Sequence, residues 1–229
     1  MLSHHIFPHF CIRPDHRRAG IRSPPRRGAL LIALALAAAL AGCATQVEVS
    51  GTFPAPVTRR LPVSVTLVLE PDFRAYRLEV TEPNEISLAL GESQAELFRT
   101  VTGAMFRELQ VGSAATPPAA TDLILVPRVE DVQIATPTET QLKIFEVWVR
   151  YRLQLLDRAG NPVADWSLAA YGKTPSRMLE SAGDALHQAS IMALRDAGAA
   201  LITGFTQAPG VAAWLAAHGA LPAGERPPQ

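Results

Sequence analysis

The chain has 229 residues, with 21 Lys and Arg, 21 Asp and Glu, and 48% hydrophobic residues. This length is enough for one domain with a real hydrophobic core. The balanced charge supplies no basic stripe of the kind that holds nucleic acid, so that class of partner is excluded.

The first informative stretch is residues 26–43, RRGALLIALALAAALAGC. Two arginines precede a run of Ala, Leu and Ile over 29–41, and small residues follow it. This order is typical of a secretory signal. The apolar run is shorter than the ~20 residues that span a bilayer, so we expect a targeting segment. The alternative is a buried Ala/Leu helix that contains a cysteine.

The four residues Leu40, Ala41, Gly42 and Cys43 resemble the lipobox of bacterial lipoproteins. The resemblance implies that diacylglycerol is attached to the Cys43 thiol and that a dedicated peptidase cuts before this residue. Three acyl chains, palmitate among them, would then hold the protein at a membrane permanently, whereas a single chain binds marginally. Ala44 stands where Asp would favour retention in the inner membrane. The resemblance therefore implies delivery to the periplasmic face of the outer membrane.

Residues 1–42 are accordingly predicted to be a signal peptide with a long basic n-region. They contain six of the 21 basic residues and one of the 21 acidic ones, so the remaining 187 residues carry 15 and 20, a net charge of about −5. Cys11 lies in the removed segment and Cys43 is consumed by lipid. No disulfide is therefore expected in the oxidising periplasm.

Residues 43–61 are predicted to be the lipidated N-terminus and an extended tether that buries little, because Thr, Val, Ser and Pro dominate them. From Pro62 the period becomes two, which predicts a half-buried strand up to Pro71. One or two short strands follow around a turn at 83–84.

The next segment has helical spacing. Ser93 and Glu96 form a capping-box pattern that predicts the start of an amphipathic helix. Its apolar stripe continues to the end of GESQAELFRTVTGAMFREL at residue 109 and consists of Leu97, Phe98, Val101, Met105 and Leu109.

Three more strands are predicted. The first, over 123–134, contains Pro127, which favours an edge position or a bulge. The longest directs one set of side chains to each face, Val147, Val149, Tyr151, Leu153 and Leu155 on one side and Glu146, Trp148, Arg150, Arg152 and Gln154 on the other. A turn over 157–162 and a strand over 163–171 complete a hairpin.

A closing helix is predicted over 176–205, with a short helix over 211–218 in the C-terminal tail, 208–229. The order β-β-α-β-β-β-α predicts an α+β domain over 62–207. We expect a two-layer sandwich, in which a mainly antiparallel sheet is covered by two amphipathic helices.

Catalytic chemistry has no visible basis in the sequence. After residue 42 only His187 and His218 remain as histidines, and no serine lies in a G-x-S-x-G elbow. Glu130 and Asp131 should point to opposite faces of their strand, so they are not expected to share an ion. We therefore expect no enzyme, no metal and no cofactor.

A candidate partner surface is predicted instead. Trp148, Arg150 and Arg152 share the strand face opposite the apolar residues, and Trp166 lies on the neighbouring strand. Trp beside Arg is the composition of interface hot spots. The alternative is that the tether or the C-terminal tail covers this face, with the arginine stems packed on the tryptophans.

The lipobox, the helix over 91–109, the strand pair FEVWVRYRLQLLDRAGNPVADWSLAAYGK and the Ala-rich closing helix together are similar to small proteobacterial outer-membrane lipoproteins. The groups that the chain resembles are the YajG-like lipoproteins and the auxiliary lipoproteins of ABC-type transport systems. The resemblance implies a membrane-tethered periplasmic domain and supplies no catalytic residues.

Three functions follow as hypotheses. The first is a non-enzymatic accessory or scaffold of a cell-envelope complex, which binds an envelope protein. The second is a carrier of a lipid or other apolar ligand, which a pocket beside the first helix would favour and a close-packed core would not. The third, an envelope hydrolase, would need His187 within hydrogen-bond reach of a serine and a carboxylate.

Overall fold

The computed structural model describes residues 44–220, except for 83, 113–120, 141 and 177–180. The chain divides into two compact units, Met1–Gly42 and Cys43–Gln229, and the fold described here is that of the second. The predicted signal peptide and Cys43 lie outside the described residues.

Two sheets form the β structure. The three-stranded sheet has the order β1-β4-β3, from β1 (Thr45–Glu48), β4 (Ile86–Ala89) and β3 (Arg77–Val80). The five-stranded sheet has the order β5-β2-β6-β7-β8, from β5 (Phe106–Gly112), β2 (Leu61–Val68), β6 (Leu123–Ala135), β7 (Ile144–Asp157) and β8 (Pro162–Pro175). The helices are α2 (Pro71–Arg74), α3 (Gly91–Met105), α4 (Pro137–Thr140), α5 (Ala182–Gly204), the 3₁₀ helix η1 (Phe205–Gln207) and α6 (Pro209–Ala217).

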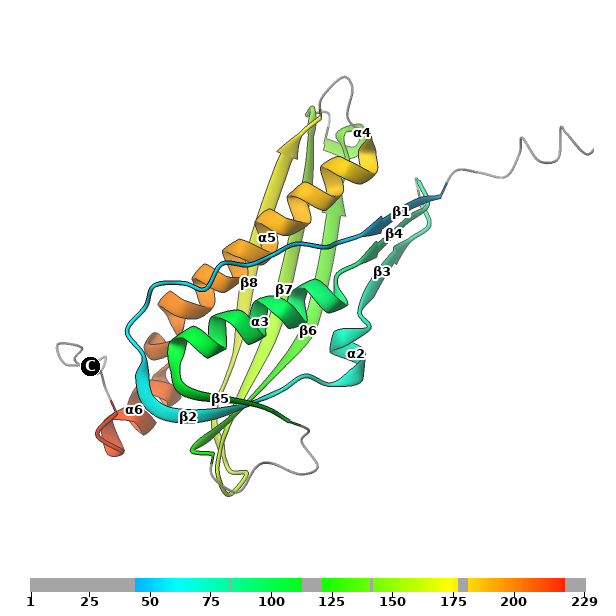
Figure 1. Cartoon of the computed structure of the whole chain (residues 1–229). Coiled ribbons are helices and arrows are strands. Elements are labelled where there is room, and N and C mark those ends of the chain that lie inside the picture. The colour runs from blue at the N-terminus through cyan, green and yellow to red at the C-terminus, as the bar shows by residue number, and fades with distance from the viewer. Residues whose placement is uncertain (1–43, 83, 113–120, 141, 177–180, 221–229) are drawn as a thin grey trace, which may run out of the picture. The chain divides into compact units, whose positions relative to one another are not determined.

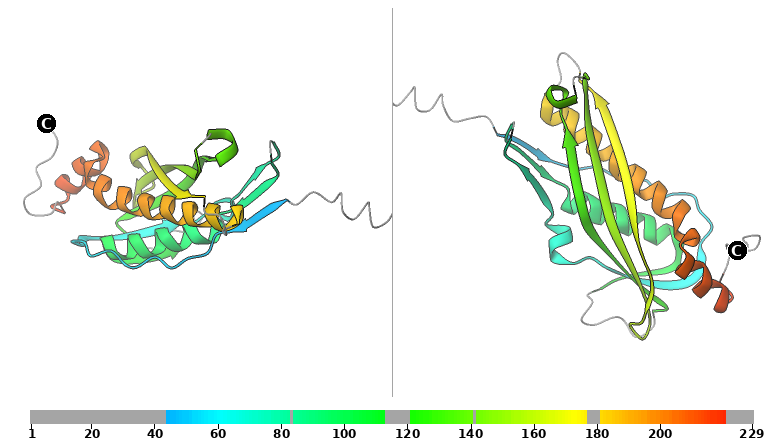
Figure 2. Two further views of the ribbon diagram at one scale, coloured as in Figure 1. Left: turned by 90° about the horizontal axis from the view of Figure 1, so that it is seen from above. Right: turned by 180° about the vertical axis from the view of Figure 1, so that it is seen from behind.

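The two long helices, α3 and α5, cover one face of the five-stranded sheet (Figures 1 and 2). This arrangement confirms the predicted α+β sandwich. The strands β6, β7 and β8 are antiparallel, whereas β2 pairs in parallel with both β5 and β6. Parallel pairing requires a crossover, and α3 lies in the connection from β2 to β5.

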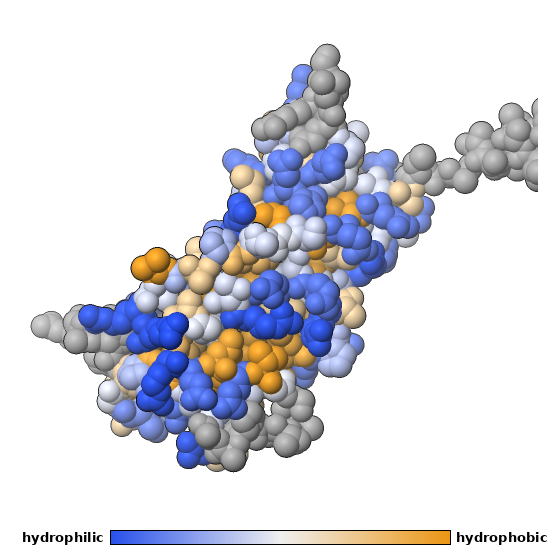
Figure 3. All heavy atoms as spheres, viewed as in Figure 1, coloured by the Kyte–Doolittle hydropathy of each residue, from blue (hydrophilic) through white to orange (hydrophobic). Residues whose placement is uncertain are grey.

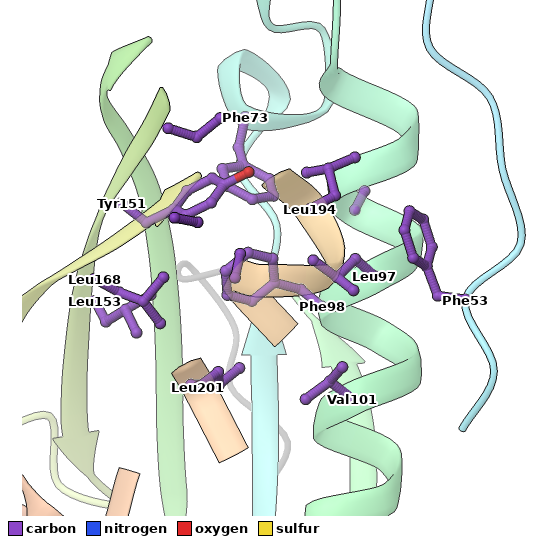
Figure 4. Close-up of a cluster of buried hydrophobic side chains, with 14 of the residues drawn as sticks. Phe53, Phe73, Leu97, Phe98, Val101, Tyr151, Leu153, Leu168, Leu194 and Leu201 are labelled. Atoms are coloured by element: carbon purple, nitrogen blue, oxygen red, sulfur yellow. The ribbon is translucent and has the colours of Figure 1, made fainter. Parts of the chain in front are cut away.

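A cluster of aromatic rings fills the centre of the core (Figure 4). The ring of Phe98 lies edge-on to those of Phe73 and Tyr151, with centroids 5.5 and 5.2 Å apart. The Tyr151 hydroxyl donates to Oε1 of Gln94 at 3.0 Å, and Nε2 of Gln94 donates to the Phe73 carbonyl at 2.6 Å. The side chains of Gln94 and Tyr151 are fully buried, but their polar groups are hydrogen-bonded, so the desolvation cost is small. These bonds fix the positions of α2, α3 and β7 relative to one another.

The prediction of an extended tether that buries little is wrong for residues 45–53. Val47, Val49 and Phe53 are buried, and β1 pairs in parallel with β4. The Ser93 hydroxyl donates to the Val49 carbonyl at 2.6 Å instead of capping its helix. The capping-box prediction is therefore wrong too, and Leu90 occupies the N-cap position of α3 without a side-chain bond. Composition missed the docked segment because its apolar residues are few and widely spaced.

The first predicted helix is too long at its C-terminus. Its chain becomes extended at Phe106, whose ring packs edge-on against Phe205 at 5.2 Å. Leu109 therefore lies in β5, paired with Val65 of β2. A leucine four residues after Met105 fits helical spacing, so periodicity could not separate the two elements.

Strand β2 is buried on both faces, not half-buried as predicted, because Val65 and Leu67 pack in the main core while Val68 packs with Ile124 and Val126 in a second apolar cluster. Pro127 lies in the part of β6 that pairs with β7 alone, since β2 pairs only with residues 123–125. The edge-like environment is therefore as predicted. A bulge is present as well, between Val129 and Asp131.

The C-terminal elements match their predictions except at one end. Helix α5 begins at Ala182 rather than 176, and the Ser181 hydroxyl caps it by accepting from the Asp184 amide at 3.1 Å. Helix α6 is present as predicted. No single described helix is long and apolar enough to cross a membrane, although Ala182–Gln207 and Pro209–Ala217, bent by 56°, pass this test as a pair.

Candidate functional site

The predicted partner residues lie on the side of the sheet that α3 and α5 leave uncovered. Trp148, Arg150 and Arg152 alternate along β7 with buried core residues, and Trp148 is 38% exposed. We call the outward side chains of β6, β7 and β8 the open face, represented by Glu130, Asp131, Glu146, Trp148, Arg150, Arg152, Asp165, Ser167, Ala169 and Tyr171.

The placement of Trp166 differs from the prediction. Its register partner on β7 is Leu153, so its side chain lies on the core side of the sheet. There its ring packs against Phe205 at 6.0 Å. The sequence placed it wrongly because strand alternation was not carried across the hairpin turn, where the register shifts between Leu155 and Leu156. The structure therefore brings together three of the four predicted residues.

The N-terminal segment does not cover the open face. Residues 47–53 run along the helix side, where the Ser50 carbonyl meets α5 and the Val49 carbonyl meets α3. Figure 3 shows that helix side, whose surface mixes hydrophilic and apolar residues. The alternative in which the tether shields Trp148 is therefore wrong for these residues. The last nine residues of the tail lie outside the described part of the chain.

The bulge in β6 changes the expected chemistry of Glu130 and Asp131. Two residues of β6 here face one of β7, which breaks the strict alternation of side chains. As a result both carboxylates reach the guanidinium of Arg150, at 3.4 Å from Glu130 and 3.1 Å from Asp131. The expectation that the two side chains point to opposite faces is wrong here, since both carboxylates contact the same guanidinium.

Further polar contacts extend from this ion pair across the open face. Arg152 is ion-paired with Asp165, and its Nη1 donates to the Ser167 hydroxyl at 3.4 Å. The Ser167 hydroxyl donates in turn to Glu130 at 3.0 Å. The two arginines are thus already neutralised, so the open face offers a patterned, charge-balanced surface rather than a basic patch.

Trp148 lies beside Tyr171 of β8, with ring centroids 5.2 Å apart. The Tyr171 hydroxyl donates to the Glu146 carboxylate, and this bond raises the pKa of Tyr171 to about 12. A shallow hollow of about 250 Å³ lies next to this pair, and its lining includes Asp131, Trp148, Arg150 and Ala169. The aromatic pair therefore stands beside a small depression that a partner side chain can enter.

The space between the sheet and the helices is filled by side chains. Phe98, Tyr151, Leu153 and Leu155 are at most 1% exposed, and Figure 4 shows the first three of them inside the core. A hollow of about 440 Å³ does lie beside α3, but polar groups share its lining and Val57 is fully exposed there. This packing does not favour the carrier hypothesis.

Both histidines contact main-chain carbonyls. Nε2 of His187 lies 2.8 Å from the Ser50 carbonyl, and Nδ1 of His218 lies 2.8 Å from the Trp214 carbonyl. A base that activates a serine would instead face its hydroxyl. Within the described residues no group of three His, Cys, Asp or Glu side chains is placed to hold a metal.

A third hollow has no signal in the sequence, because residues distant in the chain form it. It has about 760 Å³ and lies where β2, β5, β6 and the β7–β8 turn meet α6; it is lined by Pro62, Val63, Arg107, Asp122, Asp157, Arg158, Ala159, Trp214 and His218. We call it the turn-side cleft.

Asp122 organises the turn-side cleft. Burial raises its pKa, whereas hydrogen bonds from the Ser64 amide and hydroxyl, both 2.8 Å, lower it. The charges of Arg158 and Arg107, at 3.5 and 3.7 Å, lower it further, so the pKa of Asp122 lies below its usual value. The ionised carboxylate thus holds the two arginines at the rim of the cleft.

Sequence comparisons identify no relatives: no protein family model matches the chain, and no characterised protein matches it. Comparison of structures finds protein XCC0632 from Xanthomonas campestris, of family DUF330, at 12% identity and a TM-score of 0.42, over 69% of this chain and 89% of that one. It also finds a minor lipoprotein from Acinetobacter baumannii, at 13% identity and 0.40, over 65% and 91%.

A third structure is lipoprotein GNA1162 from Neisseria meningitidis, at 16% identity and a TM-score of 0.26, over 52% of this chain and 88% of that one. The solved structures to which this chain is similar thus include lipoproteins of Gram-negative bacteria. At these identities and scores the similarity carries no information on activity.

Proposed function

We propose that this protein is a non-enzymatic lipoprotein, anchored through Cys43 to the periplasmic face of the outer membrane, and that it serves as an accessory or scaffold of a cell-envelope complex. Leu40, Ala41 and Gly42 are the residues that the signal peptidase reads. The contact with an envelope protein is made by the open face, through Trp148, Arg150 and Arg152.

One observation carries this proposal: Trp148 and its arginines lie on the sheet face that the two long helices leave uncovered. Trp148 is 38% exposed and lies beside both a second aromatic ring and a hollow. Trp, Tyr and Arg are the residues most enriched at binding hot spots. Because the arginines are held by acidic neighbours, the surface is ordered before a partner arrives, which lowers the entropy cost of binding.

Membrane attachment is tested with Cys43→Ala, which removes the only thiol available for lipid after cleavage. The variant should move from the membrane fraction to the soluble periplasmic fraction. Cys11→Ala is the matched control and should leave the distribution unchanged. Retention in membranes of Cys43→Ala protein from which residues 1–42 have been removed would contradict the anchor.

Partner contact is tested by site-specific photo-crosslinking in intact cells. A photoreactive residue at Ala169, which is exposed on the open face opposite Arg150, should capture one defined envelope protein. The same residue at Arg195, exposed on α5, is the control and should not capture it. Equal yields at both positions would show that the open face has no special role.

A further inference from the structure

The segment that would connect Cys43 to the domain is docked on it. Only Ala44 separates Cys43 from β1. The Thr45 amide donates to the Glu85 carbonyl at 2.9 Å and the Val49 amide to the Ala89 carbonyl at 3.0 Å, while Val47 is 4% exposed. The chain is therefore bound to β4 from the second residue after the cysteine.

Both long helices hold the same segment. The Ser93 hydroxyl of α3 donates to the Val49 carbonyl at 2.6 Å, and His187 of α5 lies 2.8 Å from the Ser50 carbonyl. Gly51 lies directly against the Ile191 side chain. Because β4, α3 and α5 each contribute, residues 45–51 move with the domain.

This docking sets how far the domain can move from a lipid on Cys43. Two residues of extended chain reach at most about 7 Å, since one residue spans about 3.3–3.6 Å. A free tether over the 19 residues 43–61 would have a typical end-to-end distance of about 24 Å, taking ~5.5 Å times the square root of its length. The docked segment thus keeps the domain at the headgroup region.

We propose that the end of the three-stranded sheet next to Cys43 is a membrane-facing surface, and this inference rests on the lipidation of Cys43 in the proposed function. Strands β1 and β4 are parallel, so the turn before β4 lies beside Thr45. The described residues of that turn, Thr81, Glu82, Asn84 and Glu85, are all exposed and lie against the lipid headgroups.

The charge of this surface indicates which lipids it fits. Glu82 and Glu85 lie in the turn, and Asp184 lies one residue after Gly183, which packs near Thr45 and Val47. No Lys or Arg occurs in the segments 44–47, 81–86 and 181–185. Such an acidic end fits a zwitterionic lipid surface and is repelled by an anionic one.

The same placement directs the turn-side cleft away from the bilayer. Figures 1 and 2 show α6 and the β7–β8 turn at the opposite end of this unit from β1. The cleft that contains Arg107 and Arg158 would therefore stay accessible in the periplasm when the lipid is inserted.

Hydrogen exchange on vesicles tests this surface. The chain from Cys43 onward has one thiol, which can be coupled to a maleimide phospholipid in phosphatidylcholine vesicles. Coupling should slow amide exchange over 81–86 at least about threefold relative to uncoupled protein with the same vesicles, and leave the turn 157–161 unchanged. Unchanged exchange over 81–86 would overturn the proposal.

A spacer variant supplies the control. Twelve Gly and Ser residues inserted between Ala44 and Thr45 span about 19 Å and preserve the coupling. The slowing over 81–86 should then disappear, whereas the amides of Val47 and Val49 should stay protected in both proteins. Equal slowing with and without the spacer, or unprotected amides over 45–49, would contradict the docked anchor.

The lipid preference of this surface is tested separately. Phosphatidylglycerol added at low salt should reduce the slowing over 81–86, and salt should restore it. An increase with anionic lipid would refute the role of Glu82 and Glu85. Because the lipid is attached chemically, these results are independent of lipidation in the cell, which the Cys43→Ala fractionation reports separately.

Discussion

The two faces of β7 differ in the burial and polarity of their side chains. Val147, Val149, Tyr151, Leu153 and Leu155 are at most 1% exposed, and α3 and α5 cover them. Trp148, Arg150 and Arg152, which alternate with them, face solvent in a network of ion pairs. Both faces are ordered, but the first is ordered by burial and the second by polar contacts among its own side chains.

This difference separates stability from recognition. Burial of a large apolar side chain contributes about 1.5–3 kcal/mol, whereas an exposed ion pair contributes about 0–1 kcal/mol. Substitutions on the core face should therefore lower the free energy of unfolding substantially. Substitutions on the open face should leave the fold intact and change only its contacts.

The largest effect is expected from Phe98→Ala. Its ring is 1% exposed between Phe73 and Tyr151, so its loss should lower the free energy of unfolding by about 3–5 kcal/mol. Urea unfolding measures this change. Arg99→Ala is the control one residue along α3 and should cost less than about 0.5 kcal/mol, since Arg99 makes an i,i+3 pair with Glu96. Similar losses in both variants would refute the contrast.

The next effect concerns the contact of α5 with β8. A Cβ at Gly172 would lie 2.1 Å from the Ala189 carbonyl oxygen and 2.3 Å from the Ala193 nitrogen. Gly172 thus allows the helix backbone to approach the strand. Gly172→Ala should destabilise by about 1–3 kcal/mol in thermal unfolding, although Gly to Ala stabilises where there is room. Lys173→Ala is the neutral control, and a stabilised Gly172→Ala protein would show that this packing is wrong.

A matched pair of hydroxyl deletions compares the faces directly. Tyr151→Phe leaves the buried Gln94 carbonyl oxygen without its donor and should cost about 1–3 kcal/mol. Tyr171→Phe removes a hydroxyl on the open face, where water can replace it, and should cost less. Chemical denaturation at pH 7 measures both. A greater loss for Tyr171→Phe would reverse the assignment of the two faces.

The bond between Tyr171 and Glu146 gives a pH dependence. The pKa of Tyr171 is raised to about 12. The stability that its neutral phenol provides is therefore complete below pH 10 and is lost as the pH rises towards 12. Glu146→Gln should lower this pKa towards 10. Ultraviolet titration of the phenols, read as a difference between the two proteins, measures the shift, and identical curves would exclude the bond.

On the open face, only a small effect on stability is expected from Arg150→Ala. Its guanidinium is ion-paired but its side chain is 51% exposed, so the free energy of unfolding should change by less than about 1 kcal/mol. Urea unfolding checks this value. A loss of several kcal/mol would mean that the open face is part of the structural core.

The sequence predicts most of the fold because burial follows periodicity. Alternation along β7 assigned its two faces correctly, and helical spacing found α3 and α5. Leu109 fits the spacing of a helix and also that of a strand. In such a case, pairing with another strand determines the secondary structure. The docking of residues 45–53 also depends on tertiary contacts, since Ser93 and His187 hold main-chain carbonyls that composition cannot reveal.

The candidate site is predicted only in part for similar reasons. Trp148, Arg150 and Arg152 follow from alternation within one strand. The side on which Trp166 lies depends on the register across a hairpin, and the shared contact of Glu130 and Asp131 with Arg150 depends on a bulge. Neither feature has a local signal in this sequence, and the turn-side cleft joins residues far apart in the chain.

The open face is expected to make a contact with a partner that the fold does not need. The most direct measurement is the crosslinking yield from a photoreactive residue at position 169 in the Trp148→Ala/Arg150→Ala protein, with its thermal unfolding recorded alongside. Loss of about 2 kcal/mol of binding from each hot spot would lower the yield at least about tenfold, while the domain stays folded. An unchanged yield in the folded variant would contradict the account.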